Sequence, residues 1–308
     1  MRQLLAVDGS SLVHRAWHST RGDEDEARDG VVTAAFASML ATTWAYGPYR
    51  RVMVAFDHPV NRRRQDFPEY KAQRAATPDG LRTALELTRE HLEAVGVPVR
   101  RTEGVEADDL LASVSDEARA RGLTCDLLSS DRDLIALVGG AVRLLRPRQR
   151  FTDLAVEDEA AVRATYGVDP ERYVDLAALR GDPSDGLRGA SGIGPARAAR
   201  LVRDHGSVAA IYRAITDLPP AIARSLRDAR EDVERNLLLM SPLPHLDVEL
   251  DAVLTGDGDA GLGRLADLLE DLGFPGASKR VRRALDAAVG DAIPPMPPPP
   301  TDGDAPPS

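Results

Sequence analysis

The sequence predicts an α/β fold in which a mostly parallel sheet carries helices on both faces, followed by an all-helical part. Short apolar runs alternate with longer segments whose apolar residues recur at helical spacing, and this alternation is typical of a parallel sheet. Beyond about residue 150 we expect helices alone. The predicted strands are residues 2–8, 51–56, 97–100, 123–128 and 142–145.

The predicted helices follow the strands in order, with an acidic loop at residues 21–29 and an exposed basic segment at about 60–80. We expect a core at residues 1–170, a helical part at 171–289 and a disordered proline-rich tail at 290–308. The predicted helices are residues 12–18, 31–46, 81–95, 106–119, 134–137, 156–166, 172–179, 195–205, 208–214, 221–239, 261–272 and 279–289.

Bulk composition limits the class of protein. The 308 residues are 43% hydrophobic, which is enough for one large core or two modest ones. A net charge of -10 argues against a nucleic-acid partner, unless the acids are concentrated at a metal site. The single Cys125 allows no internal disulfide, the N-terminus shows no signal peptide, and no apolar run reaches transmembrane length. We therefore expect a cytoplasmic protein with no membrane partner.

Carboxylates gather at the ends of the predicted strands. Because ligands of parallel sheets bind beyond the carboxyl ends of the strands, we expect these acids to converge. Oxygen donors without Cys or His suit Mg²⁺ or Mn²⁺, and so many acids suggest two or more ions, as in two-metal phosphodiester cleavage. Any one aspartate alone is better explained as a turn or cap residue. The acids are Asp8, Asp57, Glu106, Asp108, Asp109, Asp131, Asp133, Asp182 and Asp185.

A basic segment follows the strand that ends at Asp57. Lys71 and Arg74 are three residues apart, so they would share one face of a helix and could clamp a phosphate, while Tyr70 could stack on an unpaired base. A solvated basic loop is the plainer explanation for an isolated run of charge.

Glycines at 192 and 194 precede a predicted helix with Pro195 near its first position. Such a hairpin would present backbone N–H groups to a phosphate, with a bridging monovalent cation such as K⁺. A simple helix-turn-helix corner explains the pattern about as well. His14 and His18 lack a third ligand, and no phosphate loop of the ATPase type is present.

Together these motifs resemble the 5′-3′ exonuclease and flap endonuclease family, the nuclease domain at the N-terminus of bacterial DNA polymerase I. The resemblance runs from Leu4 to about Leu201 and continues weakly to about residue 288. The motifs that carry it are Val7-Asp8-Gly9-Ser10-Ser11 with Arg15, Phe56-Asp57, Tyr70-Lys71-Ala72-Gln73-Arg74, Gly104-Val105-Glu106-Ala107-Asp108-Asp109, Asp131-Arg132-Asp133, Gly181-Asp182-Pro183-Ser184-Asp185 and Gly192-Ile193-Gly194.

The resemblance implies a PIN-like nuclease core, a helical arch over the metal site and a helix-hairpin-helix part that grips duplex DNA. It implies a first metal site at Asp8, Asp57, Glu106, Asp108 and Asp109, and a second at Asp131, Asp133, Asp182 and Asp185. Four of these acids, Asp8, Asp57, Asp108 and Asp109, would take part in catalysis with Lys71 and Arg74. The implied DNA contacts are Arg15, Arg63, Tyr70, Lys71, Arg74, Gly192, Ile193, Gly194 and Arg197.

The chain departs from the family pattern at a few positions. Arg132 and Arg197 stand where lysine is usual, and Gly186 and Arg188 replace the usual Asn and Pro after Asp185. We expect a free-standing, active nuclease for 5′ flaps, nicks and branched or gapped duplex DNA, with a separate DNA polymerase as a partner. A non-cleaving protein that binds branched DNA, and a related ribonuclease or phosphatase, are the alternatives.

Overall fold

The computed structural model describes residues 4–20, 30–47, 49–148, 151, 153–243, 245–256 and 258–289. Three expected features lie outside the described residues. They are strand residues 2–3, the acidic loop at 21–29 and the proline-rich tail at 290–308. Among the described residues, no helix combines the length and apolarity needed to cross a bilayer.

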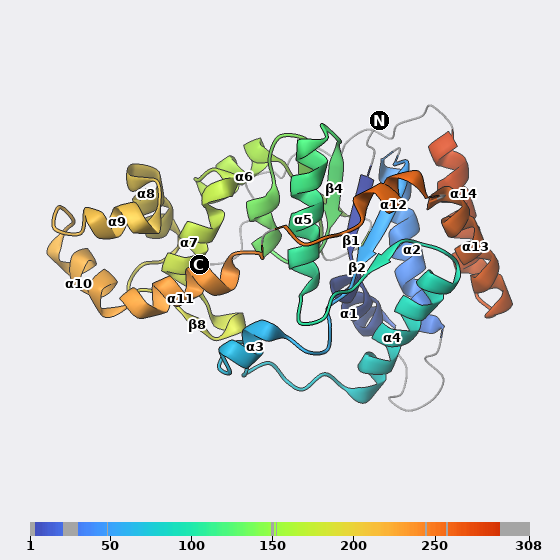
Figure 1. Ribbon diagram of the computed structural model, residues 1–308, viewed down its shortest axis with the longest axis horizontal. Coiled ribbons are helices and arrows are strands. Elements are labelled where there is room, and N and C mark those ends of the chain that lie inside the picture. Colours follow the sequence, from blue (N-terminus) through green and yellow to red (C-terminus); the bar gives the residue numbers. More distant parts are fainter. Residues whose placement is uncertain are drawn as a thin grey trace.

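A six-stranded sheet forms the centre of the fold (Figure 1). Its order is β3-β2-β1-β4-β5-β6, and every neighbouring pair is parallel except β5 and β6. The mostly parallel sheet expected from the alternating pattern is therefore confirmed. The strands are β1 (Leu4–Asp8), β2 (Arg51–Ala55), β3 (Val99–Arg100), β4 (Cys125–Leu128), β5 (Val142–Pro147) and β6 (Leu154–Glu157).

Strand β6 corrects the expectation that no strand follows residue 150. The chain reverses just after β5, so the next extended residues pair with β5 in the antiparallel direction. The predicted helix 156–166 begins later than expected, as α6 (Glu159–Tyr166). Asp158 caps it, because its Oδ1 accepts a hydrogen bond from the backbone N–H of Ala161 at 2.8 Å.

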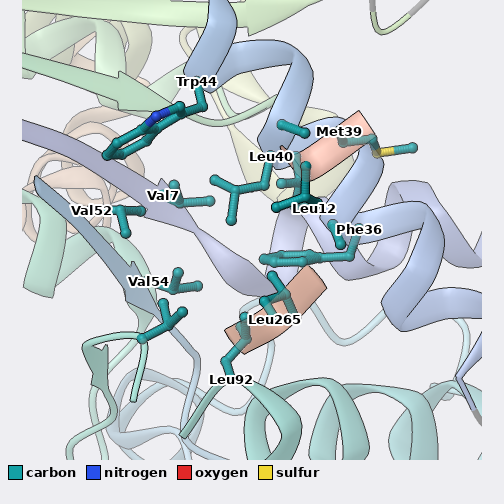
Figure 2. Close-up of a cluster of buried hydrophobic side chains, with 14 of the residues drawn as sticks. Val7, Leu12, Phe36, Met39, Leu40, Trp44, Val52, Val54, Leu92 and Leu265 are labelled. Atoms are coloured by element: carbon teal, nitrogen blue, oxygen red, sulfur yellow. The ribbon is translucent and has the colours of Figure 1, made fainter. Parts of the chain in front are cut away.

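Helices cover both faces of the sheet, as predicted. The helices of the N-terminal half are α1 (Gly9–Ser19), α2 (Val31–Tyr46), α3 (Arg62–Asp66), α4 (Asp79–Ala94) and α5 (Ala107–Ala120). One face packs against α1, α2 and α4, where Phe36, Leu40 and Trp44 of α2 lie over Val7 and Val52 (Figure 2). The other face packs mainly against α5, which contributes Leu110, Leu111 and Val114.

A separate cluster of helices has its own apolar core. Its helices are α7 (Tyr173–Arg180), α8 (Pro195–His205), α9 (Val208–Arg213), α10 (Pro220–Asp228) and α11 (Arg230–Met240). Buried Leu179, Ile193, Val202, Ile211 and Leu226 hold these helices together. A short hairpin of β7 (Gly181–Asp182) and β8 (Leu187–Arg188) leaves this cluster and extends toward α3 (Figure 1).

The chain after α11 returns to the sheet. We expected one helical part over residues 171–289, but its last helices pack with the core of the sheet. Helix α14 (Pro275–Val289) packs on α2, and α13 (Gly258–Asp271) packs on α14, α4 and β2. Both lie at the opposite end of the molecule from α8–α10 (Figure 1). Leu265 and Leu269 of α13 are fully buried in the same core as α2. The return path includes α12 (Leu250–Thr255), where Arg51 Nε donates to the Leu254 carbonyl at 2.8 Å. The apolar face of α13 thus completes the sheet core, a role that helix periodicity alone does not reveal.

We predict that Leu265→Ala lowers the free energy of unfolding by about 2–5 kcal/mol, because it removes a fully buried side chain and leaves a cavity. Urea denaturation followed by circular dichroism measures the change. Leu272→Ala is the matched control, since this leucine at the C-terminal end of the same segment is 38% exposed. Equal effects of the two substitutions would show that α13 does not contribute to the sheet core.

Candidate active site

The carboxyl ends of β1, β2 and β4 meet the first turn of α5. The backbone N–H of Ala107, the first residue of α5, donates to Asp57 Oδ1 at 2.7 Å. Ser129, just after β4, donates its hydroxyl to Asp8 Oδ2 at 2.6 Å and accepts the N–H of Asp131 at 3.0 Å. The structure therefore brings the three strand-end acids to one edge of the sheet, as the pattern predicted.

Mutual repulsion and burial strongly perturb these acids. Burial, together with the negative charge of Asp57, raises the pKa of Asp8 to about 7. Burial and the charges of Asp131 and Asp8 raise the pKa of Asp108 well above its ordinary value. Burial and the charge of Asp131 raise the pKa of Asp133 to about 7. Ionised carboxylates are therefore costly here unless positive charge reaches them.

Two of these acids have unused hydrogen-bonding capacity. Within the described part of the chain, no N–H or O–H group donates to the carboxylate of Asp108 or of Asp133. Both line a cavity of about 20 Å³, which has room for about one water molecule. Carboxylates that repel one another, lack donors and border a polar cavity are a suitable donor set for a hard divalent cation. In chemical type, these donors therefore suit the metal ions that the sequence predicts.

The second group of acids comes from two distant segments. Asp131 and Asp133 follow β4, and Asp182 and Asp185 belong to the β7–β8 hairpin, yet the charges of Asp185 and Asp182 both raise the pKa of Asp133. Asp182 caps the turn between β7 and β8, because its Oδ1 accepts the N–H of Ser184 at 2.8 Å. The two expected groups of ligands thus lie side by side, with Asp131 next to both.

Asp109 differs from the other acids in its partners. It is fully buried, and Arg63 donates to its Oδ2 at 2.7 Å and its Oδ1 at 2.6 Å. The N–H of Leu243 also donates to Oδ1 at 2.8 Å. Because a single arginine binds both of its oxygens, we leave Asp109 out of the ligand set that we propose below. Its position in the first turn of α5, next to Asp108, made the two look equivalent in sequence.

The resemblance implied that Arg63 contacts a phosphate, but its side chain is largely buried in this structure. Its guanidinium also donates to Glu106 Oε2 at 2.8 Å and to the Ser241 carbonyl at 3.0 Å, and its side chain is only 13% exposed. It joins α3 to the start of α5 and to the segment after α11. Its positive charge is paired with the carboxylates of Asp109 and Glu106 inside the protein.

Tyr70 and Lys71 also differ from the sequence prediction. Residues 69–74 form turns rather than a helix, so Lys71 and Arg74 do not share a helical face. Tyr70 is 4% exposed and packs in the core on the α5 side of the sheet, which leaves no ring face for a base. Its ring lies 4.6 Å from the Lys71 ammonium, a cation–π contact that helps to hold this charge in place.

Lys71 points into the acid cluster. Its Nζ donates to Glu106 Oε1 at 2.7 Å and lies 4.0 Å from Asp185 Oδ2, so one cation lies between the two groups of acids. Burial opposes the charged form, but Glu106, Tyr70 and Asp185 together outweigh it and raise the pKa of Lys71, so the ammonium stays protonated. Arg74 pairs with Asp185 on the outer side.

These basic side chains supply the positive charge that balances the acids in this structure. Among the residues that the structure describes, no three carboxylates, imidazoles or thiols meet closely enough to hold one metal ion. Glu106 and Asp185 instead pair with Lys71, and Asp109 with Arg63. Ions would therefore have to compete with Lys71 for Glu106.

The remaining predicted contacts lie away from the acids. Arg15 of α1 donates to the Arg148 carbonyl and lies 5.9 Å from the ring of Phe151, near the turn between β5 and β6. In the hairpin before α8, Ile193 is buried, whereas Gly192, Gly194 and Arg197 are exposed. Gly192 has a φ of 71°, and no atom comes within 4 Å of a Cβ built on Gly194. An extended ligand could therefore approach this backbone closely.

Two serines that position the acids were missed by sequence reasoning. Ser10 accepts the N–H of Asp57 at 2.9 Å, and Ser129 joins Asp8 to Asp131. Both are small polar residues within two positions of the end of a buried strand, and that placement is the signal that could have identified them.

The fold and the site place the chain in the class of resolvase-like nucleases. Residues 3–167 match the family model described as 5′-3′ exonuclease, N-terminal resolvase-like domain, and residues 168–255 match the 5′-3′ exonuclease, C-terminal SAM fold. The chain belongs to the 5′-3′ exonuclease family. The resemblance expected from the motifs is confirmed.

Curated relatives carry the match over most of this chain. DNA polymerase I of Mycobacterium tuberculosis (strain ATCC 25618 / H37Rv) is 35% identical over 76% of the chain, and that of Mycobacterium leprae is 33% identical over 94%. The matched regions are 26% and 32% of those two proteins, so the chain spans about a third of their length or less.

Solved structures show the same fold. The T5 D15 protein co-crystallised with metal ions superposes with a TM-score of 0.64 at 24% identity, over 93% of this chain and 100% of that one. The catalytic core of Rad2 in complex with DNA substrate superposes with a TM-score of 0.59 at 15% identity, over 94% and 92% of the two chains.

We predict that Arg63→Ala destabilises the fold by about 3–5 kcal/mol, because it leaves the buried Asp109 carboxylate without its partner. The free energy of unfolding in urea measures this. Arg62→Ala is the matched control, because Arg62 is the neighbouring residue on α3 and its side chain is exposed. A loss of DNA affinity with unchanged stability would restore Arg63 to the role of a phosphate contact.

Proposed function

We propose that the protein is a divalent-metal-dependent 5′-3′ exonuclease and flap endonuclease that hydrolyses phosphodiester bonds at the 5′ ends of DNA. The observation that carries this proposal is the convergence of repelling carboxylates beyond the strand ends. Among the residues that the structure describes, none donates a hydrogen bond to the carboxylates of Asp108 and Asp133. Membership of the 5′-3′ exonuclease family and the metal ions named for the T5 D15 protein support it.

Two groups of acids would hold the ions, which we propose to be Mg²⁺ or Mn²⁺. The first group is Asp8, Asp57, Glu106 and Asp108, and the second is Asp131, Asp133, Asp182 and Asp185. When bound, such ions lower the pKa of a water molecule and neutralise the charge that develops on the phosphate oxygens. Ser129 and Ser10 would keep the acids in place through the bonds described above.

Lys71 and Arg74 would bind the phosphate that is cut. Hydrolysis joins the oxygen of a water molecule to phosphorus, breaks one bridging P–O bond and protonates the oxygen that leaves. Negative charge accumulates on the phosphate oxygens during this step, and a nearby ammonium stabilises it. Lys71 lies at the border of both acid groups, which is where that phosphate would lie.

The hairpin at Gly192–Gly194 would hold the uncut duplex. Its exposed backbone, the N-terminal end of α8 and the exposed Arg197 suit a phosphate of the DNA backbone, with K⁺ as a bridging ion. We propose 5′ flaps, nicks and gapped or branched duplexes as substrates, because the two sites lie on different elements and a junction could reach both. We propose a DNA polymerase as the partner that produces such ends. The curated relatives are named DNA polymerase I, which supports this.

We predict that Asp108→Asn lowers cleavage of a labelled 5′-flap DNA in Mg²⁺ by about 10²-fold or more, since even outer-shell changes at metal sites cost about 10–100-fold. In a chelator the same variant should be more stable than the wild type, because a repelling charge is removed. Mg²⁺ should raise the melting temperature of the wild type more than that of the variant.

Asp116→Asn is the control for Asp108→Asn, because Asp116 is exposed on the same helix. Tight binding of the flap DNA without cleavage under either divalent ion would favour the non-cleaving alternative. Faster cleavage of RNA or of small phosphoesters would favour the ribonuclease or phosphatase.

We predict that Lys71→Ala lowers kcat by about 10²-fold and changes duplex affinity by less than about threefold, because its charge acts on the phosphate that is cut. Single-turnover cleavage and a binding titration separate the two effects. Lys279→Ala is a direct control, since Lys279 is the other lysine of the chain and is exposed on α14. A defect confined to affinity would place Lys71 outside the reacting centre.

A further inference from the structure

The segment that carries Lys71 lies against the turn that carries Asp182 and Asp185. The backbone N–H of Lys71 donates to the Asp185 carbonyl at 2.9 Å. The amide of Gln73 donates from Nε2 to the Pro183 carbonyl at 2.9 Å. Figure 1 shows this segment, which follows α3, beside β8. Residues more than 100 positions apart are thus joined by main-chain and side-chain hydrogen bonds.

The backbone of Lys71 is held in a strained conformation. Its φ is 57°, which for a residue with a Cβ costs about 1 kcal/mol or more. The flanking bonds balance this cost, since the Lys71 carbonyl also accepts from Arg74 N at 3.2 Å and from Arg64 at 3.3 Å. Such a conformation persists only where the surrounding contacts fix it. The position of the Lys71 side chain therefore depends on the docking of its segment.

Gly186 makes the docking possible. Its φ is 76°, and a Cβ built on it would lie 2.5 Å from Gln73 Oε1 and 2.9 Å from Nε2. The Gln73 amide therefore occupies the space that any side chain at position 186 would need. Because Gln73 is exposed and flexible, a Cβ at 186 would push its amide away rather than unfold the turn. We call the contact of Gln73 with Gly186 and Pro183 the 73/186 latch.

We propose that Gln73 is a positioning residue, and that the 73/186 latch holds Lys71 at the border of the two acid groups. The proposal rests on the nuclease function proposed above and deepens it. It also accounts for the glycine that stands at 186 where the family pattern has Asn. Nothing larger than glycine leaves room for the Gln73 amide over this turn.

Four proteins test the latch. Gln73→Ala removes the amide, and Gly186→Ala displaces it. Gly167→Ala is the matched control, because Gly167 has φ 70° and ψ 15° against 76° and 13° for Gly186. A Cβ at Gly167 meets only the end of Arg203 at 3.4 Å and Ala199 at 3.7 Å. The fourth protein combines Gln73→Ala with Gly186→Ala.

We expect Gln73→Ala and Gly186→Ala each to lower kcat on flap DNA by about three- to tenfold, with KM changed by less than about twofold. A neutral hydrogen bond is worth about 0.5–1.5 kcal/mol, which corresponds to that range. The double variant should lose no more than the single variants, because the latch can be lost only once. Gly167→Ala should keep the kcat of the wild type.

Tryptic cleavage after Lys71 and Arg74, followed by mass spectrometry, gives a readout that needs no nuclease activity. Both latch variants should be cut there at least about threefold faster than the wild type and Gly167→Ala. Unchanged proteolysis in Gln73→Ala, or equal effects of Gly186→Ala and Gly167→Ala, would overturn the latch. Proteolysis decides this even if the wild-type protein cleaves no DNA, so failure of the latch and failure of the proposed function are distinguishable.

Discussion

Repulsion among carboxylates at the carboxyl ends of three parallel strands is the constraint on which the rest of the structure depends. Asp8, Asp108 and Asp133 all have raised pKa values, so the acids need positive charge beside them. In this structure Lys71 meets part of that need by pairing with Glu106 and approaching Asp185. The segment at 60–74 is therefore both a neighbour of the site and part of its charge balance.

Long-range returns of the chain hold this arrangement in place. The segment after α11 reaches back to Arg63 and Asp109 through Ser241 and Leu243, and α13 completes the sheet core through Leu265. The β7–β8 hairpin brings Asp185 from the helical cluster to Lys71. The division between a nuclease core and a helical part is thus less sharp in space than along the sequence, because the β7–β8 hairpin and the segment after α11 both contact the site.

Ion pairs at the site differ in geometry, because one is bidentate and the other uses a single donor. The Arg63–Asp109 pair is buried, bidentate and supported by the backbone, so it stabilises the fold. The Lys71–Glu106 pair uses a single donor and a single acceptor oxygen, so a cation or a phosphate can compete for either partner. Chemically similar residues, eight positions apart, therefore have different roles.

The sequence by itself determined the parallel sheet, the helices on its faces and the convergence of Asp8, Asp57 and Asp131, because strand and helix periodicities and strand-end placement are local properties. It could not separate Asp109 from Asp108, or show that Tyr70 is buried and that Lys71 lies in a strained turn. Those roles, the antiparallel β6 and the return of α13 depend on contacts between residues far apart in the chain. Only the tertiary structure decides such contacts, because packing and the pairing of buried charges are set by the partners that folding brings together.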